Sequence, residues 1–320
     1  MKEKEYNIKF KKVSENEIVV SAKNKKDAMN KARELFNSDL NNIDIIGFCS
    51  INDLIVPYDK YELQDKLKYK STFQVGNIND KDLSNEKYSD YNSCIAIGMS
   101  YKKVDMSDKS KVYLSSCSEG IDYHVIVREK LEVIGKYLNK NNYNYKIFVD
   151  NNALDERVIA YNAGLGFFGV NNLLINDKLG SYFYIGVLLT DAVFDSDKRI
   201  DSKCINCGLC KKVCPNGAIN DNGILDSSKC ISYLNQKKNI TDSESEYFDN
   251  CIYGCDKCIS ICPYNNKIDV LYDKGIDIDE FLNMSDSEFD KEYSNKSCYW
   301  RSKKVLDRNI NIYINHLKKK

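Results

Sequence analysis

Four cysteines near the middle of the chain have the spacing of iron–sulfur ligands. They follow the pattern C-x2-C-x2-C-x3-C-P and are Cys204, Cys207, Cys210 and Cys214, with Pro215 directly after the last. In chains that hold two 4Fe-4S cubanes, such a run directs three thiolates to one cubane and the fourth to the other. A structural zinc site usually needs two C-x2-C pairs separated by a longer insert. The spacing therefore predicts a double-cluster region.

A second block repeats most of this pattern but lacks its leading cysteine. It consists of Cys255, Cys258, Cys262 and Pro263. Crossed ligation, as in two-cluster ferredoxins, would give cluster one Cys204, Cys207, Cys210 and Cys262. Cluster two would then receive Cys214, Cys255, Cys258 and one ligand from elsewhere in the chain. The residues leave two candidates for that ligand, Cys230 and Cys251.

Composition and charge set the class of protein. The 320 residues are 42% hydrophobic, which is enough for a core, and 47 basic side chains balance 47 acidic ones. No overall field therefore attracts the chain to nucleic acid or anionic lipid. The N-terminus is charged, and the longest apolar stretch, around 182–189, is far shorter than the roughly 20 residues that span a bilayer. Without a secretory signal, thirteen cysteines indicate metal ligation or redox chemistry. We expect a soluble cytoplasmic protein without membrane contact.

The elements that must position these cysteines alternate between strand and helix. Hydrophobic patterning predicts a hairpin over 6–22, helices over 25–36, 124–138 and 153–163, and strands over 43–51, 93–99, 145–149, 173–175 and 181–189. This alternation indicates an α/β or α+β domain. We divide the chain into an N-terminal extension (1–27), a catalytic domain (28–200), a ferredoxin-like double-cluster domain (201–270) and a C-terminal helical segment with a basic tail (271–320).

Two further motifs have alternative interpretations. The glycines of 164–169 fit G-x-G-x-x-G, but they follow a predicted helix and precede a predicted strand, which is the wrong order for a dinucleotide site. A helix C-cap followed by a tight turn explains them structurally. Asp122-Tyr123-His124 nearly matches the D-x-H-x-x-G motif of histidine-ligated cobalt, but Val127 replaces the glycine, so we exclude such ligation. Cys49, Cys94, Cys117 and Cys298 fit buried small hydrophobes.

Several further motifs follow one another along the chain. They are Asp122-Tyr123-His124, Val149-Asp150, Glu156-Arg157, the run 163–169, Leu179-Gly180-Ser181-Tyr182, the run 229–234 (KCISYL), 252–258 (IYGCDKC), 262–265 (CPYN), Trp300-Arg301 and 305–309 (VLDRN). In this order they resemble the epoxyqueuosine reductase family of cobalamin and double-cluster tRNA-modifying enzymes. The match extends over roughly residues 28–315.

The resemblance implies cofactors and site residues. It implies that residues 28–200 bind cobalamin and that Cys230 is the eighth cluster ligand. For the cofactor pocket it implies Asp150, Cys117, Gly164, Gly166, Gly169, Asn171, Gly180, Ser181 and Tyr182. Asp150 also ends a predicted strand before a turn, where α/β domains present catalytic groups. We expect Asp150 to be the proton donor, with a pKa raised by burial against the corrin.

The function implied is reduction of epoxyqueuosine in tRNA to queuosine. We expect Lys237, Lys238 and the basic tail 301–320 to bind phosphates around the anticodon loop, an external low-potential donor to supply electrons, and the chain to be a monomer. One alternative is a cobalamin-dependent reductase of a small epoxide or organohalide, similar to reductive dehalogenases. A second alternative is a non-catalytic two-cluster electron-transfer protein.

Overall fold

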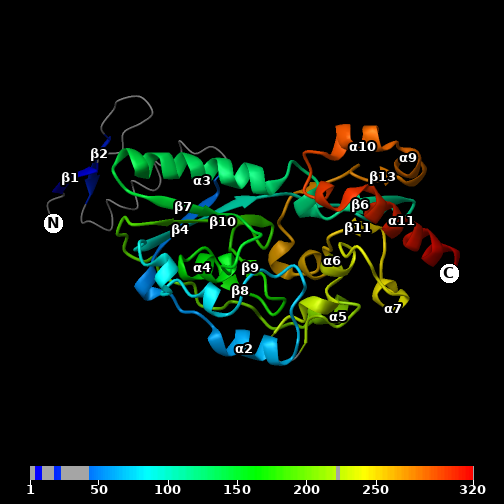
Figure 1. Ribbon diagram of the computed structural model, residues 1–320, viewed down its shortest axis with the longest axis horizontal. Helices are drawn as coiled ribbons and strands as arrows, with labels where there is room; N and C mark the ends of the chain where they lie inside the picture. Colours follow the sequence, from blue (N-terminus) through cyan, green and yellow to red (C-terminus); the bar gives the residue numbers. More distant parts are fainter. Residues whose placement is uncertain (1–3, 9–17, 23–42, 221–223, 320) are drawn as a thin grey trace.

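The computed structural model describes residues 4–8, 18–22, 43–220 and 224–319 (Figure 1). Two layered bodies account for most of these residues. The first contains a four-stranded sheet between helices, and the second contains a three-stranded sheet covered by the C-terminal helices. The segment with the two cysteine blocks lies beside both.

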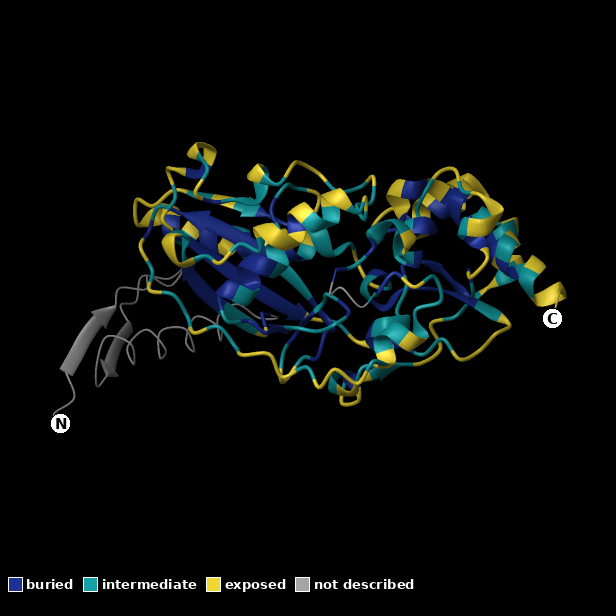
Figure 2. Ribbon diagram, turned by 90° about the horizontal axis from the view of Figure 1, so that it is seen from below, coloured by how far each residue is buried: buried dark blue, intermediate teal, exposed yellow. Residues whose placement is uncertain are grey.

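The sheet of the first body has the strand order β3-β4-β10-β7, and all neighbouring strands are antiparallel. The strands are β3 (Ile45–Ser50), β4 (Ser93–Ser100), β10 (Phe183–Thr190) and β7 (Tyr145–Phe148). Helix α3 (Tyr123–Lys140) packs on one face, and α4 (Glu156–Asn162) packs on the other. Because both faces are covered, the central strands are apolar almost throughout and appear buried in Figure 2.

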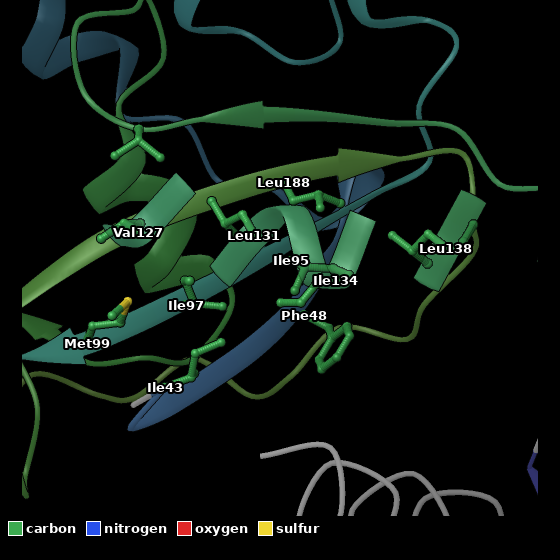
Figure 3. Packing of buried hydrophobic residues seen from close by; sticks show 12 residues of the cluster. Ile43, Phe48, Ile95, Ile97, Met99, Val127, Leu131, Ile134, Leu138 and Leu188 are labelled. Carbon is green, nitrogen blue, oxygen red and sulfur yellow. The ribbon is translucent and has the colours of Figure 1, made fainter. Parts of the chain in front are cut away.

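Side-chain alternation along β4 divides the core into two layers. Ile95 and Ile97 point towards α3, where they meet Leu131 and Ile134 (Figure 3). Ala96, between them, points to the opposite face and packs with α4 residues. The buried residues of α3 recur at helical spacing, which is the pattern that predicted this helix.

The second body combines residues that are distant in sequence. Its sheet has the order β11-β6-β13, formed by β11 (Cys251–Tyr253), β6 (Lys111–Leu114) and β13 (Ile276–Asp277). Helices α9 (Ile278–Asn283), α10 (Asp286–Tyr293) and α11 (Ser302–Lys318) complete this core. The central strand β6 thus comes from the N-terminal half of the chain, so the second body's core crosses the boundary we place near residue 201.

The remaining elements are short. They are β1 (Lys4–Ile8), β2 (Ile18–Ala22), α2 (Tyr58–Lys66), β5 (Lys103–Val104), β8 (Phe167–Phe168), β9 (Leu174–Ile175), α5 (Leu209–Val213), α6 (Ile231–Leu234), α7 (Asp242–Ser245), α8 (Lys257–Ser260) and β12 (Val270–Leu271). Pairs β1-β2 and β8-β9 are antiparallel, and β12-β5 is parallel. Turns of 3-10 helix occupy 51–53, 79–81, 86–88, 116–118, 227–229, 263–265 and 299–301.

The mixed α/β class expected from the sequence is confirmed, and each predicted strand from residue 43 onward overlaps an observed one. The helix expected over 153–163 is shorter, because the side chain of Asp155 caps its first turn by accepting from the Val158 amide. The helix expected over 25–36 lies outside the described residues. Within the described residues, no helix is both long and apolar enough to cross a membrane.

Close packing between β3 and α4 gives a stability prediction. A Cβ atom added at Gly47 would lie 1.9 Å from the backbone oxygen of Ala163, which cannot move without shifting α4. We expect Gly47→Ala to lower the free energy of unfolding by about 1–3 kcal/mol, as overpacking does. Urea denaturation measures this. Gly120→Ala is the control, since an added Cβ meets nothing within 4 Å there; equal stability of the two variants would contradict the packing described.

Candidate active site

Each cysteine block forms a short helix flanked by thiol-bearing loops. Helix α5 carries Cys210 and is followed directly by Cys214, and α8 carries Cys258 and is followed by Cys262. Gly208 begins α5 in the left-handed conformation, with φ +73°, which glycine adopts without a steric penalty. The two helices pack against each other. This contact brings thiols from both blocks together.

The first group of thiols surrounds one small pocket. Its cysteines are Cys204, Cys207, Cys210 and Cys262. Burial raises the pKa of the Cys262 thiol, and the nearby thiols of Cys204 and Cys207 add to the increase. Three ligands from the first block therefore meet one from the second. This is the arrangement of a crossed cubane site.

The second group consists of Cys214, Cys230, Cys255 and Cys258. Burial raises the pKa of the Cys258 thiol, and the nearby thiols of Cys255, Cys230, Cys214 and Cys210 add to the increase. All four members of the group line one cavity. Cys251 is held differently. It is buried in β11, and its thiol donates to the backbone oxygens of Tyr253 and Gly254 at 3.5 and 3.7 Å. The geometry therefore favours Cys230 over Cys251 as the ligand left open by the motif.

A large cavity joins the second group of thiols to the first body. Its volume is about 1190 Å³, larger than the roughly 300–1,000 Å³ of typical small-molecule pockets. All four thiols of the second group line it, together with Asp150. Ser181 and Ser297 also line it, and each has a buried hydroxyl oxygen without a hydrogen-bond partner in the described structure. A large ligand with many polar groups, such as cobalamin, fits this cavity.

Asp150 lies two residues after the end of β7, on the cavity wall. Asp150 and Asn151 both adopt positive φ, 45° and 49°, so the chain turns sharply and presents the carboxylate to the cavity, where its side chain is 55% exposed. The hydroxyl of Tyr123 donates to Asp150 Oδ2. His124 Nε2 lies 3.6 Å from the same oxygen, and Asp122 contacts His124 Nδ1 at 2.6 Å. Asp150 is not the N-terminal cap of α4, because the side chain of Asp155 caps that helix.

The expected rise of the Asp150 pKa is wrong for the protein as described. Burial alone would raise the pKa, but the hydrogen bonds from the Tyr123 hydroxyl and the Asn151 amide, together with the interaction with His124, outweigh it and lower the pKa to about 2. Burial would lower the pKa of His124, yet the carboxylates of Asp150 and Asp122 raise it. Asp150 is therefore a carboxylate at neutral pH, with two proton-bearing side chains as neighbours.

Sequence reasoning missed a second carboxyl group in the cavity. Glu156, at the start of α4, lines the same wall, and burial raises its pKa to about 7. The side chain of Asn152 links the two acids, donating to the Asp150 carbonyl at 2.9 Å and to Glu156 Oε1 at 2.6 Å. The sequence analysis names Glu156 only as part of a motif and gives it no role in the site. Its burial depends on tertiary packing, which the local sequence does not show.

The structure separates the expected cofactor residues into two sets. Cys117, Gly169, Asn171 and Ser181 line the cavity with Asp150. The others lie outside its lining and hold the surrounding loops in place; they are Gly164, Gly166, Gly180 and Tyr182. At Gly180, for example, an added Cβ would lie 2.0 Å from Asn265 Oδ1, which accepts from the Ser181 amide at 2.7 Å. This contact ties the β10 turn to the second cysteine block.

Much of the expected basic patch is engaged within the protein. Arg308 donates to the carbonyl oxygens of Lys237 and Lys238 at 2.6 and 2.8 Å, so α11 does meet the 237–238 segment. Lys237 pairs with Glu244, whereas Lys238 is exposed. The buried residue Arg301 stacks on the Trp300 ring, and Lys303 pairs with Asp307. One face of the tail is thus part of the second body's core, whereas Lys304, Lys318 and Lys319 are exposed. Lys238 is the more accessible of the two predicted lysines at 237–238.

An aromatic cluster at the cavity was also missed as a group. Phe73 lies 4.8 Å from Tyr233 and 5.5 Å from Trp300, measured between ring centroids. Phe73 and Trp300 line the cavity, and the indole of Trp300 is fixed by donating to the Tyr253 hydroxyl at 2.7 Å. These residues are far apart in sequence, so no local pattern could have grouped them.

Two family models match separate parts of the chain. Residues 85–151 match the epoxyqueuosine reductase QueG model (DUF1730), which ends directly after Asp150. Residues 203–265 match the 4Fe-4S double cluster binding domain, which contains both cysteine groups. The first matched region thus includes Asp150 of the cavity wall, and the second matched region is the cluster region.

Whole-length comparisons agree. The chain is 32% identical to an epoxyqueuosine reductase of Bacillus anthracis (86% of this chain, 77% of that protein) and 33% identical to one of Staphylococcus aureus (86% and 77%). A crystal structure of an epoxyqueuosine reductase with an epoxyqueuosine-modified tRNA-Tyr stem loop is similar at TM-score 0.83 and 28% identity, covering 91% of this chain and 82% of that one. A Bacillus subtilis relative, whose catalytic aspartate loop is swung out of the active site, has TM-score 0.82 and 27% identity over the same shares. The chain therefore belongs to the epoxyqueuosine reductase family.

Proposed function

We propose that this protein reduces epoxyqueuosine in tRNA to queuosine, with two 4Fe-4S clusters and cobalamin as cofactors. The observation that carries the proposal is a single cavity that contains both the Asp150 network and the thiols of one cluster group. Family membership gives the reaction, and the cavity joins an electron source to a proton source. Removing an epoxide oxygen as water takes two electrons and two protons, so the site needs both.

The two thiol groups define an order for electron flow. The group containing Cys230 lines the large cavity, whereas the group containing Cys262 lines the separate small pocket. Clusters held by these thiols supply one-electron transfer. The group lining the cavity is therefore the final electron relay, and the other group receives electrons first.

Several residues of this chain are suited to hold the corrin. Ser181 and Ser297 offer unpartnered hydroxyls, and Gly169 lines the cavity beside Asn171, whose Oδ1 would lie 2.7 Å from an added Cβ. Asn171 donates to the Cys258 carbonyl at 3.5 Å, so this wall is linked to the cluster loop. Bound cobalamin supplies an electron pair to the epoxide. The protein's part is to orient the substrate, exclude water and supply protons.

Proton supply rests on Asp150 and its neighbours. Ligands that fill the cavity would remove water from the exposed carboxylate, which favours its protonated form. His124 is placed to provide that proton, and Asp150 then passes it to the departing oxygen. Burial and Asp150 raise the pKa of Tyr123, so its hydroxyl orients the carboxylate and does not give up its proton. Glu156 titrates near neutral pH in the same wall and is a second proton source for the released water.

The aromatic cluster and Lys238 suit the nucleic-acid part of the substrate. Unpaired bases of an RNA loop stack on aromatic side chains, and Phe73 and Trp300 offer such surfaces at the cavity. Gln236 also lines the cavity, and Lys237 and Lys238 follow it directly. Phosphates near a base bound in the cavity would therefore meet these lysines.

The proton-donor role of Asp150 predicts a large kinetic effect. We expect Asp150→Asn to reduce turnover of an epoxyqueuosine-modified anticodon stem-loop by roughly a hundredfold to ten-thousandfold while clusters and cobalamin stay bound. Mass spectrometry of the nucleosides measures turnover, and the visible spectrum measures the bound clusters and cobalamin. Asp177→Asn, an exposed carboxylate outside the cavity lining, is the control. A fully active Asp150→Asn enzyme would remove Asp150 from the mechanism.

Assignment of Cys230 to cluster two predicts a specific loss of iron. Anaerobically reconstituted Cys230→Ala should retain about four of the about eight irons of a double-cluster chain, because one cubane lacks a ligand. Cys251→Ala should retain all of them, since the Cys251 thiol is engaged with backbone oxygens. Iron analysis with electron paramagnetic resonance of the reduced proteins tests both. The reverse result would show that Cys251 is the ligand.

Phosphate contacts predict salt-sensitive tRNA binding. The logarithm of affinity should fall with the logarithm of salt concentration, and each lost contact should reduce that slope by about 0.7 for single-stranded RNA. We expect Lys238→Ala to weaken binding more than Lys237→Ala, because Lys237 is already paired with Glu244. Lys140→Ala, on the distant end of α3, is the control. Salt-independent binding, or unchanged affinity after replacing both Lys237 and Lys238, would contradict this contact.

A further inference from the structure

Three exposed aliphatic side chains surround the first group of cluster thiols. Ile205 is 66% exposed, Ile261 is 41% exposed and Leu209 is 38% exposed. Ile205 and Leu209 line the same pocket as the four thiols, and Ile261 directly precedes Cys262. A single exposed aliphatic residue is ordinary, but several around one functional group typically mark an interaction surface.

The two loops that carry these residues contain basic but no acidic side chains. The two ligand loops, 203–214 and 261–267, contain no aspartate or glutamate, although the chain as a whole has equal numbers of acids and bases. They carry four lysines, Lys203, Lys211, Lys212 and Lys267. Lys203 pairs with Asp177, and Lys212 and Lys267 are exposed. The two loops around the first thiol group are therefore apolar and basic, and the acids Asp201 and Asp269 stand just outside them in sequence.

We propose that Ile205, Leu209 and Ile261, with Lys212 and Lys267, form the docking surface for a small acidic electron-transfer protein. The inference rests on the proposed function, because that function makes this cluster the first electron acceptor. One electron passes from the reduced partner to cluster one, which oxidises the partner and reduces the cluster without breaking or forming a bond. Opposite charges increase the rate of encounter, and a small apolar centre suits a transient redox complex.

The kinetics of cluster reduction test this proposal. A fully reduced flavodoxin, which is a small acidic flavin protein, is mixed anaerobically with the oxidised protein in a stopped-flow instrument. Formation of the flavin semiquinone reports each electron transferred. We expect the rate to fall steeply with ionic strength in the wild type. We expect Lys212→Glu, and the double variant Ile205→Ser with Ile261→Ser, to lower it at least about tenfold at low salt.

Controls separate docking from damage to the cluster. Val193→Ser, at a 79% exposed aliphatic residue outside both pockets, and Lys140→Glu should keep the wild-type rate. Reduction by dithionite, which needs no docking surface, should be equally fast in all variants, with equal iron content. The proposal is overturned if Lys212→Glu reacts with flavodoxin at the wild-type rate, or if the variants slow equally with dithionite.

A separate measurement, turnover driven by dithionite, tests the proposed function independently of the docking surface. Dithionite-driven turnover of the modified stem-loop bypasses the docking surface, so its absence would contradict the proposed function alone. Slow flavodoxin reduction together with normal dithionite-driven turnover in Lys212→Glu would support both.

Discussion

The packing of α5 against α8 is the contact on which the rest of the site depends. Each helix carries a cysteine of one thiol group and is followed by a cysteine of the other, so neither group can assemble unless the two blocks fold back onto each other. The same contact orders the loops that follow the helices. Asn265, just after the second block, accepts from the Ser181 amide and thereby ties the cluster region to the end of the catalytic sheet. Electron transfer and the shape of the cavity are thus linked through one interface.

The second constraint is the left-handed turn after β7. Two consecutive non-glycine residues with positive φ are energetically unfavourable, and such strain persists where surrounding contacts hold it. Here Tyr123 and His124 hold the Asp150 carboxylate, while Asn152 connects the turn to Glu156. The arrangement places one ionised carboxyl and one that titrates near neutral pH in the same wall. Pairs of acids with separated pKa values are typical of sites that move protons.

Local sequence predicted the parts of this protein that depend on local spacing. The strands and helices of the first body follow from apolar periodicity, and the iron–sulfur region follows from cysteine spacing. Cys230 could not be separated from Cys251 by spacing alone; that required the resemblance and is favoured by the positions of the thiols. The direction predicted for the Asp150 pKa shift was wrong, because burial was considered without the contacts that residues of α3 make with the carboxylate. Glu156, Phe73 and Trp300 were not recognised because only the tertiary fold brings them to the cavity.

An anaerobic crystal structure of the protein reconstituted with iron, sulfide and cobalamin would test the central claim most directly. The account predicts one cubane on Cys204, Cys207, Cys210 and Cys262, a second on Cys214, Cys230, Cys255 and Cys258, and the corrin in the cavity between the second cubane and Asp150. A corrin bound elsewhere, or a second cubane that does not border the corrin, would contradict the claim that one cavity joins the electron and proton sources.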